Sequence, residues 1–138
     1  MAEETVVKET LTEEMKSAGA ELTRALDEAN WPVVGSFWYY ESDDNRWKLM
    51  LASPRVSSDG AKEAYGAVIR ALDALHQPRS NVNHITVIEP DHPLVKRLSS
   101  AVKTGWTIGG IPFSRQAING SIVEDAYLYR MTSESAAA

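Results

Sequence analysis

The sequence predicts an α+β domain: a mixed or mainly antiparallel sheet of about five strands with three helices, in the order α-β-β-α-β-α-β-β. Three observations predict this class. Residues 33–54 and the segment around Asn119-Gly120 have the pattern of β-hairpins, and three other segments repeat apolar residues at helical spacing. A single strand pattern, residues 82–89, lies between the second and third helical segments. Hairpins near both ends of the sheet favour antiparallel pairing.

The first hairpin has the most constraining pattern. Aromatic and β-branched residues crowd 33–40, and 42–45 are turn formers, so Glu41 is expected opposite Arg46 and Phe37 opposite Met50. One face is expected to hold Val34, Trp38, Tyr40, Trp47, Leu49 and Leu51. The other is expected to hold Val33, Phe37 and Met50 inside a fringe of Glu41, Arg46 and Lys48. We expect a helix or a partner chain to cover part of this second face.

Each helical segment has start and stop signals. Thr10 to Glu13 fits a capping box before the first helix, which Asn30-Trp31-Pro32 ends. Residues 57–60 offer N-cap oxygens for the second helix, whose expected apolar stripe is Ala61, Ala64, Tyr65, Val68, Ile69, Leu72 and Leu75. Asp91 is the expected N-cap of a third helix that ends near Gly105.

The remaining segments complete the sheet. Residues 82–89 are expected to form a strand with Ile85 and Val87 on one face, and 106–113 is expected to be partly extended. Asn119-Gly120 favours a type I′ turn, followed by one strand over 121–131. The expected organisation is a flexible leader at 1–9, a single α+β domain at 10–131 and a disordered tail at 132–138.

Composition sets limits on the class of protein. With 138 residues, 43% of them hydrophobic and 24% charged, the chain suits one soluble domain. No apolar run approaches the ~20 residues of a membrane helix, and the acidic N-terminus lacks the apolar stretch of a secretory signal, so we expect a cytoplasmic protein and no membrane. The absence of cysteine excludes a disulfide framework, a thiol nucleophile and cysteine-ligated zinc.

The negative charge is concentrated at the start of the chain. Residues 1–30 hold eight acids and three bases, whereas 31–138 hold eleven of each. Two interpretations remain open, a solvated helix face and a docking surface for a basic partner.

Four segments, FWYY, RWKLMLASP, PDHPLVKRL and VEDAYLYR, make the chain resemble small uncharacterised bacterial proteins of unknown function over roughly residues 30–131. These segments are strand cores and helix starts. The resemblance therefore implies no catalytic residue, substrate or cofactor.

The densest group of acid–base residues is His84, Glu89, Asp91 and His92. Asp91 and His92 follow a strand and precede a helix, where they serve either a site or the helix start. His84 lies at the far end of the strand, roughly 20 Å away at ~3.3 Å per residue, so no metal site is expected. Asp125 needs a partner, for which Arg115 is the candidate, either as a structural ion pair or as a site acid.

Other motifs are missing. The sequence has no Gly-x-Ser-x-Gly elbow and neither type of glycine-rich phosphate loop, so no cofactor is expected. Residues 79–115 hold five bases against two acids, a weak signal for nucleic acid in an acidic chain.

The preferred hypothesis is a non-catalytic binding or interaction module, with a homodimer or protein partner docked on the second hairpin face. The alternative is a small enzyme or enzyme accessory with a site near Pro90 to His92 and Asp125. Weak nucleic-acid binding through residues 79–115 is the third hypothesis, and it is not favoured.

Overall fold

The structure is a computed structural model that describes residues 9–132. Its helices are α1 (Glu13–Glu28), α2 (Arg55–Asp59), α3 (Ala61–Leu72), the 3-10 helix η1 (Arg79–Val82) and α4 (Pro93–Ala101). Its strands are β1 (Gly35–Glu41), β2 (Arg46–Ala52), β3 (Ile85–Ile88), β4 (Ile111–Phe113), β5 (Gln116–Ile118), β6 (Ser121–Val123) and β7 (Ala126–Met131). The predicted α+β class and element order are confirmed.

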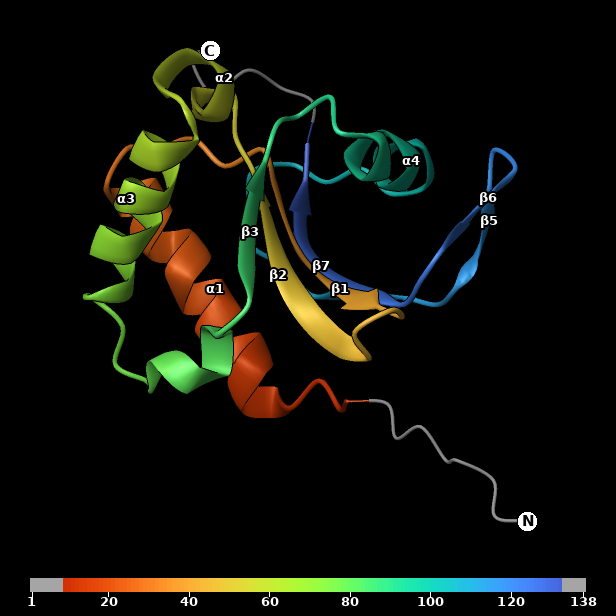
Figure 1. Cartoon of the computed structure of the whole chain (residues 1–138), viewed down its shortest axis with the longest axis horizontal. Coiled ribbons are helices and arrows are strands. Elements are labelled where there is room, and N and C mark those ends of the chain that lie inside the picture. Colours follow the sequence, from red (N-terminus) through yellow and green to blue (C-terminus); the bar gives the residue numbers. More distant parts are fainter. Residues whose placement is uncertain (1–8, 133–138) are drawn as a thin grey trace.

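A mixed five-stranded sheet, ordered β3-β2-β1-β7-β4, forms the middle layer. Only β2 and β3 pair in parallel, and the other neighbours are antiparallel. Helices α1 and α3 cover one face, while α4 and the separate β5–β6 hairpin cover the other (Figure 1). The sheet therefore separates two hydrophobic cores.

The register of the first hairpin is as predicted. Glu41 pairs with Arg46, and Phe37 pairs with Met50. Trp38, Tyr40, Trp47, Leu49 and Leu51 face α1 and α3, also as predicted. Val33 and Val34 are exchanged between the faces, because regular strand alternation begins only at Gly35.

The second hairpin face is covered within the chain. Phe37 is fully buried and Met50 is 8% exposed, in a core that includes Leu94 and Leu98 of α4. The expected cover is thus a helix. Phe37 and Met50 therefore offer little free surface to a partner, and the homodimer expected on this face stays a prediction.

Two helix caps differ from the prediction. Thr12, not Thr10, precedes α1, and its hydroxyl accepts the Met15 amide hydrogen at 3.1 Å. At α4 the cap is His92 rather than Asp91: its Nδ1 accepts the Leu94 amide hydrogen at 3.1 Å. Pro93 explains the second difference, since a residue before proline avoids helical angles, and His92 is indeed extended at φ −54° and ψ 137°.

The second helical segment is divided. Residues 55–59 form the short α2, and Gly60, with φ +89°, separates it from α3 without a side-chain cap. Ala64, Val68 and Ala71 are the buried residues of α3. Ile69 was expected in the buried stripe but is 54% exposed, because the helix contacts its neighbours over a narrow face.

The predicted Asn-Gly turn is present, but two of the later strands begin or end at other residues than expected. The strand expected over 82–89 begins at Ile85, with Ile85 and Val87 on the face of α1 and α3. Asn119 and Gly120 both have positive φ, at +51° and +82°, as the type I′ turn requires. The strand expected over 121–131 is interrupted at residues 124–125, because β6 pairs with β5 whereas β7 pairs with β1 and β4.

The ends of the described chain are held by the sheet. Glu9, assigned to the leader, accepts hydrogen bonds from both nitrogens of Trp47, and the Thr132 amide donates to the Val34 carbonyl at 2.9 Å. The rest of the expected leader and tail lies outside the described residues. Within residues 9–132, no helix combines the length and the apolar character needed to cross a bilayer.

Candidate functional site

The structure does not bring the predicted site residues into one place. His92 lines a hollow beside α4, whereas Asp125 lines a different, more open hollow beside β4. Asp91 is exposed and Pro90 is half-buried in the turn before α4. The site expected near Pro90 to His92 therefore does not include Asp125.

Arg115 and Asp125 do make contact, but through the backbone of Arg115. The Arg115 amide donates to Asp125 Oδ1 at 2.8 Å, while the guanidinium pairs with Glu124 at 3.2 Å. This arrangement holds the ends of the β5–β6 hairpin together.

The other members of the predicted acid–base group also have separate neighbours. His84 Nε2 lies 3.0 Å from Arg46 on the adjacent strand, and Glu89 accepts a hydrogen bond from the Ser57 hydroxyl. Among residues 9–132, no three His, Asp or Glu side chains are grouped closely enough to hold a metal ion.

The hollow beside α4, called the α4 hollow below, has a volume of about 380 Å³. Strands form its floor: Tyr39 of β1 lies opposite Lys48 of β2, and Met50 of β2 lies beside Thr86 of β3. Its complete lining is Tyr39, Glu41, Lys48, Met50, Thr86, His92, Pro93, Leu94 and Arg97. Polar side chains from three strands and one helix thus meet over an apolar base.

The start of α4 supplies the wall of the α4 hollow. Because Nδ1 of His92 accepts the Leu94 amide hydrogen, a neutral His92 ring carries its proton on Nε2. His92 and Arg97 are both half-buried. The wall therefore presents hydrogen-bond donors, one of them permanently charged.

The floor adds further donors. The Tyr39 hydroxyl accepts the Glu124 amide hydrogen at 3.0 Å, which leaves its own proton free to donate. Burial raises the pKa of Tyr39, so the hydroxyl stays protonated near neutral pH. Lys48 pairs with Asp44 at 3.0 Å and, through this contact, lowers the pKa of that carboxyl group. Glu41 is the single carboxylate of the lining.

Of the catalytic candidates named from the sequence, only His92 lines this hollow, and Arg97 was named only among the bases of the nucleic-acid hypothesis. The predicted hairpin register already placed Glu41 and Lys48 on one face. This shared face was the one sequence feature that pointed to polar residues gathered at the α4 hollow. Thr86 and Arg97 join them only through the parallel pairing of β3 with β2 and the path of α4, which no local pattern encodes.

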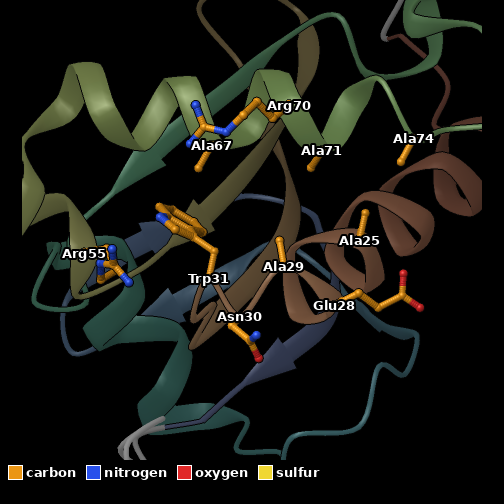
Figure 2. Close-up of a pocket in the computed structure, with 10 residues that line it drawn as sticks. All are labelled: Ala25, Glu28, Ala29, Asn30, Trp31, Arg55, Ala67, Arg70, Ala71 and Ala74. Atoms are coloured by element: carbon orange, nitrogen blue, oxygen red, sulfur yellow. The ribbon is translucent and has the colours of Figure 1, made fainter.

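A second depression, called the α1–α3 groove below, has a volume of about 540 Å³ on the other side of the sheet. It runs between the end of α1 and α3, with Trp31 in the middle of its lining and Arg55 and Arg70 near the indole (Figure 2). Sequence reasoning assigned none of these residues to a site.

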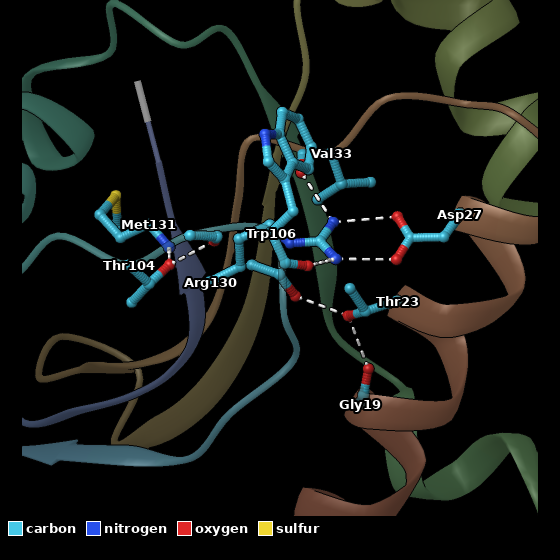
Figure 3. A network of polar contacts seen from close by, with 10 residues as sticks. Gly19, Thr23, Asp27, Val33, Thr104, Trp106, Arg130 and Met131 are labelled. Atoms are coloured by element: carbon cyan, nitrogen blue, oxygen red, sulfur yellow. Dashed lines mark hydrogen bonds and ion pairs between the residues drawn. The ribbon is translucent and has the colours of Figure 1, made fainter. Parts of the chain in front are cut away.

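A buried polar network ties α1 to the sheet (Figure 3). The Arg130 guanidinium donates to both oxygens of Asp27, at 2.9 and 2.8 Å, and to the carbonyls of Val33 and Trp106. The Thr23 hydroxyl donates to the Gly19 carbonyl at 2.8 Å. Both terminal nitrogens of Arg130 thus have acceptors, and the network links α1 to the sheet.

The basic residues of 79–115 have separate partners and positions and do not form one basic surface. Arg79 pairs with Asp73 and Arg115 pairs with Glu124, whereas Arg97 lines the α4 hollow. The local positive charge that motivated the nucleic-acid hypothesis is thus partly neutralised.

Comparison with protein families, with curated proteins and with solved structures finds no match for this chain. The resemblance to small uncharacterised bacterial proteins stays a prediction.

Proposed function

We propose that this protein is a binding module that holds a small polar anion in the α4 hollow. The observation that carries the proposal is that Lys48, Arg97 and Tyr39 line one concave surface. Charge-assisted hydrogen bonds from Lys and Arg to a carboxylate or phosphate are among the stronger polar contacts in proteins. The half-buried setting makes them stronger than on an open surface.

Glu41 refines the class of ligand. A purely anionic molecule would be repelled by this carboxylate, whereas a hydroxyl or amino group on the ligand would donate to it. The lining therefore suits a compact anion that also carries a hydrogen-bond donor, such as a hydroxy acid. The salt bridge from Lys48 to Asp44 is partly exposed, with side-chain exposures of 28% and 52%, so a ligand can replace it at small cost.

The test is a titration of the ¹⁵N-labelled chain with malate, followed by amide chemical shifts. Saturable shifts are expected at Tyr39, Lys48, Thr86 and Leu94, and glycerol, which is neutral, should produce none. Arg97→Gln should weaken malate binding about tenfold, because it removes one charge-assisted contact.

Lys96→Gln is the matched control. Lys96 precedes Arg97 on α4 but is exposed and does not line the hollow. Equal weakening by both variants would reduce the effect to net charge and contradict the proposal. Scattered shifts, or shifts of similar size with glycerol, would also contradict it.

A small enzyme is the second candidate function, favoured by one observation: His92 and Tyr39, two residue types that can serve as general acids or bases, line the same hollow. Prolonged incubation with ¹³C-labelled malate separates the two functions. Binding without new carbon signals supports the module, and turnover that disappears in His92→Asn supports the enzyme. Asn is chosen because its side chain can still cap α4.

A further inference from the structure

The α1–α3 groove differs in shape and chemistry from the α4 hollow. One wall is the last turn of α1, the other is α3, and Arg55 of α2 lies at one end. The lining is Ala25, Glu28, Ala29, Asn30, Trp31, Arg55, Ala67, Arg70, Ala71 and Ala74. α3 and the turn that follows it form this second wall, which is about 10 Å long from Ala67 to Ala74 at roughly 1.5 Å per residue. The groove is therefore an elongated, largely apolar trough.

Charge divides the groove along its length. In Figure 2, Arg55 and Arg70 both lie near the indole of Trp31, whereas Glu28 lies toward the opposite end. Arg70 reaches back over Gly66, whose missing side chain leaves room: a Cβ there would lie 3.4 Å from the Arg70 guanidinium. One end of the trough is thus cationic and the other end carries a carboxylate.

The two guanidinium groups have donors to spare. Arg55 uses its Nε for Asp59 at 2.6 Å, which leaves its terminal nitrogens for another acceptor. Within residues 9–132, the structure records no acidic partner for Arg70. A guanidinium fork fits a carboxylate in a bidentate way.

We propose that the α1–α3 groove binds an amphipathic carboxylate. Its head pairs with Arg55 and Arg70, and its aliphatic or aryl body lies along Trp31 and the alanines of both helices. Glu28 fixes the direction, since a carboxylate at that end would be repelled. This site lies across the sheet from the α4 hollow and does not depend on the function proposed there.

Fluorine NMR of the chain labelled with 5-fluorotryptophan tests the proposal, because the four tryptophans give separate reporters. Octanoate is the probe, octan-1-ol the neutral control and octylammonium the cationic control. Octanoate should shift the Trp31 signal saturably at millimolar concentration and leave the Trp38 and Trp47 signals in place. Octanol should bind about tenfold more weakly, since it cannot form the charge-assisted contacts.

Variants locate the site. Arg70→Gln, at an exposed position, should weaken octanoate about tenfold, whereas Lys96→Gln removes the same charge on the far side of the sheet and should change nothing. Ala67→Leu should prevent octanoate binding, because the larger side chain fills the trough. If this variant does not fold, Arg70→Gln still tests the proposal. Three results would overturn the proposal: no saturable Trp31 shift, equal binding of octanol or octylammonium, or unchanged affinity in Arg70→Gln. Malate shifts around the α4 hollow should persist in Arg70→Gln, so the two proposals fail independently.

Discussion

Arg130 is the one charged residue that the described chain buries almost completely, with 2% of its surface exposed. Asp27 balances the charge through two hydrogen bonds, and backbone carbonyls take further donors. Only Nε lacks an acceptor among the described residues. Such a group stabilises a fold only while its partners remain, because a buried charge without them keeps its full desolvation cost.

Asp27→Ala is therefore expected to lower the free energy of unfolding by about 2–3 kcal/mol. This is below the value for a fully buried pair, because the Asp27 side chain is 35% exposed and Arg130 keeps its carbonyl partners. Urea denaturation measures the change as a lower midpoint at an unchanged slope.

Asp73→Ala is the control for that prediction. It breaks an ion pair whose side chains are 56% and 65% exposed, so the expected change is below about 0.5 kcal/mol. If Asp27→Ala and Asp73→Ala lower the free energy of unfolding by similar amounts, the burial of Arg130 does not make its ion pair more important for stability.

At this scale the sequence was informative about neighbours across a turn. The pairing of Phe37 with Met50 followed from strand alternation and one four-residue loop. The Arg130–Asp27 pair could not be predicted, because its members lie 103 positions apart and many acids could have met that arginine.

At the scale of elements, Gly19 allows α1 to approach the sheet closely. A Cβ at this position would lie 2.5 Å from the Tyr129 hydroxyl and 2.8 Å from Trp38 Nε1. These two groups are themselves hydrogen-bonded at 2.9 Å, and the Tyr129 hydroxyl also donates to the Lys16 carbonyl. The glycine is thus required by packing, against the helix preference for alanine.

Gly19→Ala is expected to destabilise the protein by about 1–3 kcal/mol, since the clash outweighs a propensity gain of about 1 kcal/mol. Thermal unfolding followed by circular dichroism measures this as a lower midpoint.

Gly66→Ala provides the matched comparison in α3. Its Cβ would meet only the flexible end of Arg70, at 3.4 Å, so the propensity gain should raise stability by about 0.5–1 kcal/mol. A stabilising Gly19→Ala would show that α1 can move away from the sheet without loss.

The two predicted caps illustrate the limit of local patterns at this scale. Thr10 and Asp91 matched good capping motifs, yet Thr12 and His92 cap the helices. Glu9 is held by Trp47, so the chain reaches α1 along a path set by tertiary contact. A capping motif identifies residues that are able to cap a helix. The path by which the chain enters the helix then decides which of these residues is the cap.

At the scale of the whole molecule, β1 is the central strand of the sheet and is enclosed on all sides. β1 pairs with β2 on one side and β7 on the other, and each sheet face has its own core. The β5–β6 hairpin is a separate two-stranded sheet, with Ile122 51% exposed. Two-stranded sheets are marginally stable in water, so stability should be uneven across the chain.

Hydrogen exchange should follow this division. Amides of β1 are expected to exchange only on global unfolding, whereas those of β5 and β6 should exchange by local opening at a much lower free energy. Exchange measured by NMR at several urea concentrations distinguishes the two routes. Equal protection of β1 and β5–β6 would contradict the prediction.

The sequence by itself determined the α+β class, the element order, the register of the first hairpin and the Asn119-Gly120 turn, because each follows from patterns among residues close together in the chain. Only the tertiary structure decided which side chains share a surface. Lys48, Thr86 and Arg97 come together through a parallel strand pairing and a helix that crosses the sheet. Arg55 and Arg70 likewise line one groove only because α3 packs beside both α1 and α2. Such contacts are set by how whole elements bury their apolar faces, which no local spacing records.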